Sequence, residues 1–197
     1  MQRFFYNEKI KTTVLINQLN AAMELYNNRH FDLDKVLVGL LKNCIQLYKD
    51  LGYADKESQV QSLLTEMVTA QRGVNPYTLL KQNIRRNEML QIVFFKILQS
   101  LELLLRTDYN AANEKLQQAA DLVSQIILAA MQAGLLTDAE LKAIKTQKDT
   151  EAAWKKLDAD SNISLGKKRV LLLVSSFDAL LLLDELLAPL IKSLKQI

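Results

Sequence analysis

The sequence is poor in the residues from which most catalytic and metal centres are built. It contains one cysteine, Cys44, and one histidine, His30, among 197 residues. Zinc sites of histidine and cysteine ligands, and the paired Glu-x-x-His motifs of di-iron bundles, cannot be assembled from such a set. No predicted helix repeats an acidic pair at a spacing suited to Mg²⁺. We therefore expect no metal and no other cofactor.

Nucleophilic catalysis also lacks its usual residues. A serine, cysteine or threonine nucleophile needs a positioned base, and His30 in NNRHFD is the only imidazole. Cys44 has no partner for an internal disulfide and lies among apolar residues in LVGLLKNCIQLY, which favours a buried, inert thiol. With only 5 glycines, a glycine-rich phosphate loop has no place in the chain. The sequence predicts that the protein is not an enzyme.

The scarcity of turn-forming residues indicates an all-α fold. There are 5 glycines and 2 prolines, while apolar residues recur at intervals of three and four and no segment alternates with a period of two. We predict a compact bundle of about seven helices, forming one domain over residues 1–197 with a sub-boundary at 72–76. The long helices near 76–106 and 164–196 are expected at its centre.

Local signals place the predicted helix ends. Asp32 is a candidate N-cap and Gly52 a C-cap for a helix between them, and Thr137 with Glu140 forms the pattern of a capping box. In RGVNPY, Gly73 ends one helix and the Asn-Pro pair starts the next. The predicted helices cover about residues 7–28, 32–51, 55–71, 76–106, 107–134, a polar segment from 137, and 164–196.

The segment from Val170 to Ile191 is apolar enough to raise the question of a membrane span. It contains acidic residues, each of which costs roughly 2.5 to 3.5 kcal/mol near a bilayer centre. Projected at about 100° per residue, the polar side chains Ser175, Asp178 and Glu185 fall on one narrow stripe. We therefore predict a bundle helix with one edge facing solvent, and no transmembrane span.

The charge pattern gives little support to nucleic-acid binding. The net charge is only +3, and residues of both signs are interspersed along the chain. The candidate basic surface has no aromatic residue interleaved for stacking on bases. The N-terminal sequence lacks the pattern of a secretory signal, which favours a cytoplasmic location. The basic surface candidates are Lys81, Arg85, Lys167, Lys168 and Arg169.

The segment KQNIRRNEM contains a local irregularity. Helical projection places Asn83, Arg86 and Asn87 on the apolar face of the predicted fourth helix. Either this helix outruns the bundle and its first turns lie in solvent, or these groups form a buried network with Asp178 or Glu185, or they bind a ligand or partner. A buried arginine would need such an acidic partner, since an unpaired buried charge costs several kcal/mol.

Because catalytic motifs are missing, the leading functional hypothesis is a non-catalytic interaction protein with an adaptor, chaperone-like or assembly role. It would bind a protein partner through helix faces, or self-associate through an alanine-rich seam in residues 107–134. The first alternative is a small-molecule or lipid receptor with a pocket near Asn83, Arg86 and Asn87. The second is a weak nucleic-acid binder.

Overall fold

The computed structural model describes residues 3–78 and 85–194, and within these ranges it contains eight α-helices, one short 3₁₀ helix and no strand. The predicted all-α fold is thereby confirmed. In chain order the elements are α1 (Phe5–Asn27), α2 (Leu33–Leu51), α3 (Ala54–Gln71), α4 (Arg86–Gln132), α5 (Asp138–Ala143), α6 (Gln147–Lys156), η1 (Leu157–Ala159), α7 (Ser161–Leu173) and α8 (Ser176–Leu194).

The chain divides into two compact units, and the division falls within α1 and α4 instead of at the predicted sub-boundary. Ile10–Tyr109 forms one, which we call the four-helix unit. Met1–Lys9 together with Asn110–Ile197 forms the other, which we call the C-terminal unit. The prediction that the chain is a single domain stays a prediction.

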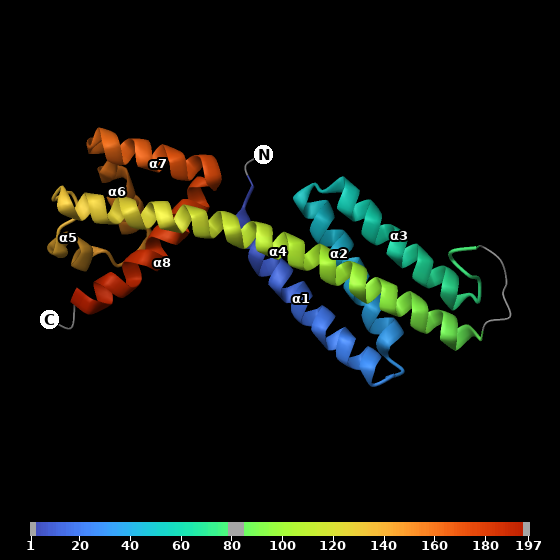
Figure 1. Ribbon diagram of the computed structural model, residues 1–197. Helices are drawn as coiled ribbons and strands as arrows, with labels where there is room; N and C mark the ends of the chain where they lie inside the picture. The colour runs from blue at the N-terminus through green and yellow to red at the C-terminus, as the bar shows by residue number, and fades with distance from the viewer. Residues whose placement is uncertain (1–2, 79–84, 195–197) are drawn as a thin grey trace. The chain divides into compact units, whose positions relative to one another are not determined.

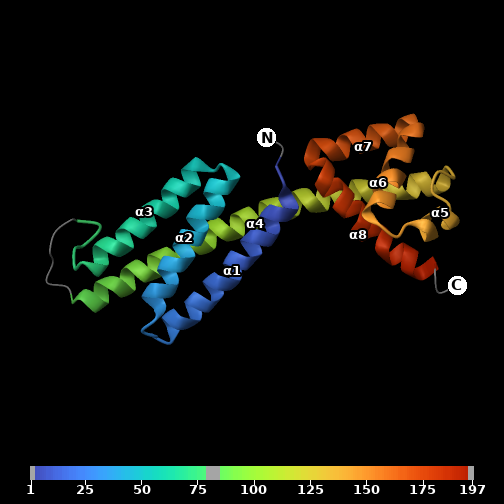
Figure 2. The same cartoon turned by 180° about the vertical axis from the view of Figure 1, so that it is seen from behind.

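The four-helix unit consists of α1, α2, α3 and the part of α4 before Asn110, which run side by side in both views (Figures 1 and 2). Its core is built from one apolar stripe of each helix, as the three- and four-residue periodicity predicts. The fully buried members with the largest side chains include Leu19, Leu37, Leu40, Leu41, Tyr48, Met67, Ile97, Leu101 and Leu105. Cys44 also lies in this core, as predicted.

Gly52 ends α2 as the sequence predicts. Its φ of 72° is left-handed, and its N–H bonds back to the last turn of the helix. Asp32 holds the expected N-cap position of α2, but its side chain makes no capping hydrogen bond. The local signals thus place both ends of α2 correctly, but the expected hydrogen bond from the helix start to the Asp32 side chain is not formed.

The predicted break between the fourth and fifth helices, near Asp108, is wrong. α4 runs without interruption from Arg86 to Gln132. Asp108 does not cap a new helix, because its carboxylate points into the four-helix unit, where it accepts a hydrogen bond from the Tyr48 hydroxyl at 2.8 Å and pairs with the Lys56 ammonium group. The Thr107 hydroxyl bonds to the Leu103 carbonyl at 2.7 Å, so it also stays within the helix.

The predicted start of this helix near residue 76 is not observed either. Residues 76–78 form a turn, in which the Asn75 side chain accepts the N–H of Tyr77 at 2.9 Å. α4 begins at Arg86. The Asn-Pro signal therefore marks a turn capped by Asn75, and the helix that it was expected to open begins later.

The C-terminal unit packs α5, α6, α7 and α8 with the part of α4 after Tyr109 (Figures 1 and 2). The alanine-rich seam of α4 is buried within this unit and does not form a surface for self-association. It belongs to the same apolar core as residues of α7 and α8, and Gly166 of α7 lies against Ile126. The buried seam consists of Ala112, Leu116, Ala119, Val123, Ile126 and Ala130.

The predicted last helix, residues 164–196, is two helices. α7 ends at Leu173, Val174 is extended, and α8 begins at Ser176. The break is built by a reciprocal cap. The Ser175 hydroxyl donates to the Asp178 carboxylate at 2.7 Å and accepts the Asp178 N–H at 3.1 Å. The projection that placed both residues on a solvent-facing edge assumed one continuous helix, and this assumption fails at Val174.

The polar segment that begins at Thr137 also forms two helices, each opened by a capping box. The predicted box of Thr137 and Glu140 is present at α5, where the Thr137 N–H donates to the Glu140 carboxylate at 3.0 Å. A second box, of Thr146 and Asp149, opens α6 and follows the same sequence pattern. The second box was readable in the sequence and was missed, because the apolar spacing continues across it.

Candidate functional site

An open cleft of about 1010 Å³ lies in the four-helix unit. One wall is the turn between α1 and α2, and the other is the first two turns of α4. Phe31 lines the cleft from the α1–α2 turn with 83% of its surface exposed, and Ile92 lines it from α4 with 56% exposed. The remaining apolar lining is Tyr26, Leu33, Leu90 and Phe94. A single exposed apolar side chain is common on a protein surface, but here two of them, Phe31 and Ile92, line the same cleft.

The turn that carries Phe31 has a strained backbone. Arg29 follows α1 with a φ of 49°, a left-handed conformation that glycine normally supplies at this position. The N–H of Arg29 bonds to the Tyr26 carbonyl at 3.0 Å and that of His30 to the Leu25 carbonyl at 2.9 Å, which is the Schellman pattern. A side chain other than glycine costs about 1 kcal/mol here. Strain of this kind is concentrated at binding sites.

His30 and Phe31 form a stacked pair at the mouth of the cleft. Their ring centroids are 4.5 Å apart, and the Nδ1 atom of His30 accepts the N–H of Asp32 at 3.3 Å. The polar lining carries both charges, since Arg29 lines the cleft together with Asp34 and Glu88. The cleft thus combines apolar side chains with charged groups of both signs.

The predicted ligand or partner residues are distributed between the units. Asn87 lines the cleft beside Glu88. Arg86, the first residue of α4, is exposed to solvent, as is Arg85 before it. Asn83 lies outside the described residues, and so does Lys81. Arg86 fits the interpretation in which the first turn of the helix lies in solvent. Asn87 fits the interpretation in which this segment contributes to a binding site, because it lines the cleft.

Asp178 and Glu185, the predicted acidic partners of Arg86, bind other groups. Asp178 is fully buried, and its carboxylate accepts the backbone N–H groups of Phe5 and Tyr6, each at 3.1 Å. Glu185 accepts the Tyr6 hydroxyl. Burial and this hydrogen bond to Glu185 raise the pKa of Tyr6. These contacts hold the first turn of α1 against α8 within the C-terminal unit, so both carboxylates have a structural role.

The predicted basic surface is smaller than expected, because Lys167 does not belong to it. Lys167 is only 5% exposed. Its ammonium group donates to the Trp154 carbonyl at 2.5 Å and to Asp158 at 2.6 Å, and lies 4.9 Å from the centre of the Trp154 ring. Lys168 and Arg169 are exposed on α7. The sequence does not reveal this difference, since the three cations are consecutive and only one of them points inward.

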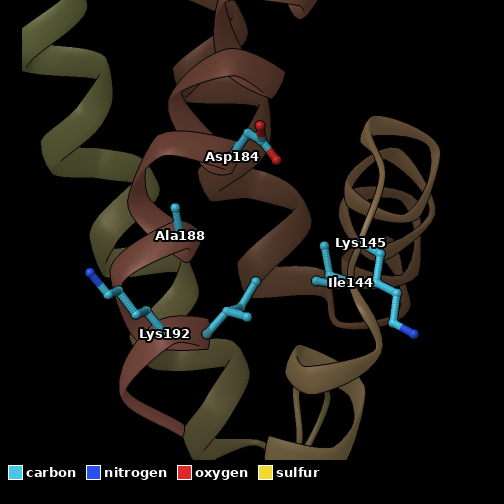
Figure 3. Close-up of a pocket in the computed structure, with 6 residues that line it drawn as sticks. Ile144, Lys145, Asp184, Ala188 and Lys192 are labelled. Carbon is cyan, nitrogen blue, oxygen red and sulfur yellow. The ribbon is translucent and has the colours of Figure 1, made fainter. Parts of the chain in front are cut away.

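A second cavity, of about 320 Å³, lies in the C-terminal unit between α8 and the connection from α5 to α6 (Figure 3). Asp184, Ala188 and Lys192 line it from α8, and Ile144 and Lys145 line it from the connection. Figure 3 shows the side chains of Lys145 and Lys192 extending away from each other. Asp184 accepts the Thr150 hydroxyl at 2.9 Å. No set of polar groups converges in this cavity, so it is not a candidate site.

The described residues offer no group of three or more histidine, cysteine or acidic side chains arranged to hold a metal ion. Burial raises the pKa of the Cys44 thiol to about 12, which disfavours the reactive thiolate. Among the helices of residues 3–78 and 85–194, none combines the length and the apolar character required to cross a bilayer. The candidate site is therefore the cleft between Phe31 and Ile92.

Sequence reasoning missed the residues that define this cleft. Phe31 was readable as an aromatic residue inside a helix break, in NNRHFD, where a polar turn is the usual expectation. Ile92 carried no signal, because exposed apolar residues on a helix also occur singly. Comparison with protein-family models, curated proteins and solved structures finds no match for this chain.

Proposed function

We propose that this protein is a non-catalytic interaction module that binds a segment of a partner protein in the cleft between the α1–α2 turn and the start of α4. The observation that carries the proposal is the exposure of Phe31 in the wall of that cleft. An apolar side chain of the partner inserts between Phe31 and Ile92 and removes both from water. Because of the large area that they bury, aromatic side chains contribute strongly to the energetics of protein interfaces.

The strained turn supports the same proposal. Glycine at position 29 would relieve the left-handed backbone, yet the chain has an arginine there, at the rim of the cleft. Arginine is enriched at interfaces because its guanidinium group donates several hydrogen bonds in a fixed geometry. The backbone cost is then offset by contacts of the arginine with the partner. Asp34 and Glu88 on the same rim provide acceptors for the partner's polar groups.

A protein segment fits the cleft better than a small molecule does. Small-molecule sites enclose most of their ligand. This cleft is open, and the aromatic side chain in its wall is itself largely in solvent. The predicted alternative of a ligand site that includes Asn87 is retained as an outcome of the test. Nucleic-acid binding is not carried further, since Lys167 is buried.

Site-specific photocrosslinking tests the proposal. A benzophenone side chain replaces Phe31 in the full chain, in its native cell, and a matched variant carries it in place of Leu103. Leu103 is 73% exposed on α4 and does not line the cleft. We expect position 31 to crosslink a discrete protein that position 103 does not. Ile92→Glu should abolish this product, since it places a charge against the inserted apolar side chain.

The outcomes separate the alternatives. Equal products from both positions, or a product from position 31 that survives Ile92→Glu, would contradict the proposal. A crosslinked lipid or metabolite, identified by the mass added to the intact chain, would replace it with the small-molecule function. The control variant Leu103→Glu, which changes an exposed leucine elsewhere in the same unit, should leave the product of position 31 unchanged.

A further inference from the structure

The outer face of α7 carries an apolar stripe with a cation on each side. Leu165 and Leu172 are 52% and 85% exposed, and Lys168 and Arg169 are exposed as well. Both ribbon views show α7 along the edge of the C-terminal unit (Figures 1 and 2). The inner face is occupied, since Ile163, Lys167 and Val170 are buried. The outer face is therefore a surface distinct from the cleft of the four-helix unit.

The two exposed leucines lie in line along the helix, one heptad apart. An α-helix turns by about 100° per residue, so Leu165 and Leu172 lie within about 20° of each other and two turns apart. Lys168 and Arg169 fall about 60° to one side of Leu165 and about 40° to the other. The two leucines thus form one apolar line along α7 with a cation on each side of it, although in a complete heptad seam one of these two positions would also be apolar.

The charge on this face is uncompensated among the described residues. α7 has no acidic residue. None of the ion pairs found within residues 3–78 and 85–194 involves Lys168 or Arg169. The adjacent Lys167 does form one, with Asp158. The two outward cations thus differ from Lys167 in forming no ion pair within the described part of the chain.

We infer that the outer face of α7 binds an amphipathic helix of a partner protein whose apolar stripe is flanked on both sides by glutamate or aspartate. Leu165 and Leu172 pack on the apolar stripe, while Lys168 and Arg169 pair with the acids on its two edges. Complementary flanking charges set both the choice of partner and its register on the helix.

An anionic membrane surface is disfavoured by the width of the apolar face. A helix that lies in a bilayer interface presents an apolar face of about 100° or more. The stripe on α7 spans only about 20° between Leu165 and Leu172 before a cation is reached on each side, and the further exposed leucine, Leu171, is separated from Leu165 by Lys168. A second copy of the same face is also disfavoured, because it would oppose Lys168 and Arg169 to identical cations.

Designed peptides test the inference directly. One labelled amphipathic peptide carries a leucine stripe flanked by glutamates, and a matched peptide carries lysines at the same positions. Binding of each to the full-length protein is followed by fluorescence anisotropy. We expect the acidic peptide alone to bind, and Lys168→Glu with Arg169→Glu to weaken it at least about tenfold. The same double variant should bind the basic peptide instead.

Matched controls exclude a general charge effect. Lys115→Glu with Lys148→Glu makes the same change in net charge at exposed positions of the same unit, and should leave the affinity within about twofold. Leu172→Ser should weaken binding about tenfold or more, because a leucine is no longer buried. Leu128→Ser, at another exposed leucine of this unit, should not weaken it.

Three results would overturn the inference. One is binding of neither peptide, and another is binding of the acidic peptide that the Lys168 and Arg169 reversals leave intact. The third is absence of peptide binding together with either tight association with phosphatidylserine vesicles or concentration-dependent self-association in sedimentation. In that case the Lys168→Glu and Arg169→Glu double variant would abolish the association. The peptide-binding measurements are independent of the crosslinking at position 31, because α7 does not line that cleft.

Discussion

The backbone N–H of Phe5 donates to the carboxylate of Asp178 at 3.1 Å, across 173 positions of the sequence. The same carboxylate accepts the Tyr6 N–H and the Ser175 hydroxyl. One buried side chain therefore caps two helices, α8 through the local box with Ser175 and α1 through a contact distant in sequence. The first amides of a helix lack acceptors within it, so each of these bonds satisfies a group that burial would otherwise leave unpaired.

Replacement of Asp178 should destabilise the C-terminal unit strongly. Asp178→Ala removes a cap from each of two helices and leaves buried N–H groups without acceptors, so we expect the free energy of unfolding to fall by about 3 kcal/mol. Urea denaturation followed by circular dichroism measures the change. Asp121→Ala, at an exposed aspartate of α4 bonded only to Gln117, is the control and should cost less than about 0.5 kcal/mol. Equal effects of the two variants would show that the double cap contributes little.

Adjacent lysines of α7 should respond differently to the same substitution. Lys167→Met removes the hydrogen bond to the Trp154 carbonyl and the pairing with Asp158. Since hydrogen bonds of a buried charged group are strong, we expect a loss of about 2 kcal/mol in the free energy of unfolding. Lys168→Met changes an exposed residue and should stay within about 0.5 kcal/mol of wild type. Thermal and urea unfolding of both variants provide the comparison, and equal losses would place Lys167 at the surface.

The cap of α5 should be sensitive to acid. A hydrogen bond from Lys156, followed by the N–H of Thr137, lowers the pKa of Glu140 from 4.5 to about 2. The stabilisation is present above the unfolded value of 4.5 and is lost as the pH falls through the folded value of about 2. Carboxyl-detected NMR titration should give this low midpoint. Lys156→Met should raise it toward 4.5, and a midpoint near 4.5 in the unmodified protein would contradict the contact.

A buried hydroxyl on α1 offers a stabilising substitution. Thr12 is fully buried, and its hydroxyl has no hydrogen-bond partner among the described residues. Thr12→Val keeps the branched shape and removes the cost of burying an unpaired polar group, so we expect a gain of about 1 kcal/mol in the free energy of unfolding. The control is Thr65→Val, since the Thr65 hydroxyl is exposed and bonds to the Gln61 carbonyl. A loss of stability in Thr12→Val, measured by urea unfolding, would mean that the hydroxyl has a partner.

Local signals in the sequence predicted helix ends well where a single residue or a short motif decides them. Gly52 and the box of Thr137 with Glu140 depend on groups within five positions, and both were placed correctly. Asp108 and Asp178 were misread because the groups that bind them lie far away in sequence. A polar residue on an apolar stripe looks the same in the sequence in three different situations. It can cap a helix, face solvent at the edge of a bundle, or form a hydrogen bond with a residue that is distant in sequence.

The candidate sites show the same contrast between features set by local sequence and features set by distant residues. Asn87 was predicted from its angular position, and it lines the cleft. Phe31 was not predicted, since a helix break gives no indication that an aromatic side chain there stays in solvent. Lys167 and Lys168 could not be separated, because the orientation of α7 depends on how it packs against α4 and not on its own composition.

The double cap at Asp178 also has a consequence for the order in which the chain can fold during synthesis. Phe5 is synthesised 173 residues before its acceptor, which corresponds to roughly 9 to 35 s at ordinary rates of translation. Over that interval the aromatic residues at positions 4–6 have no α8 on which to dock. The C-terminal unit can therefore close only after α8 has emerged.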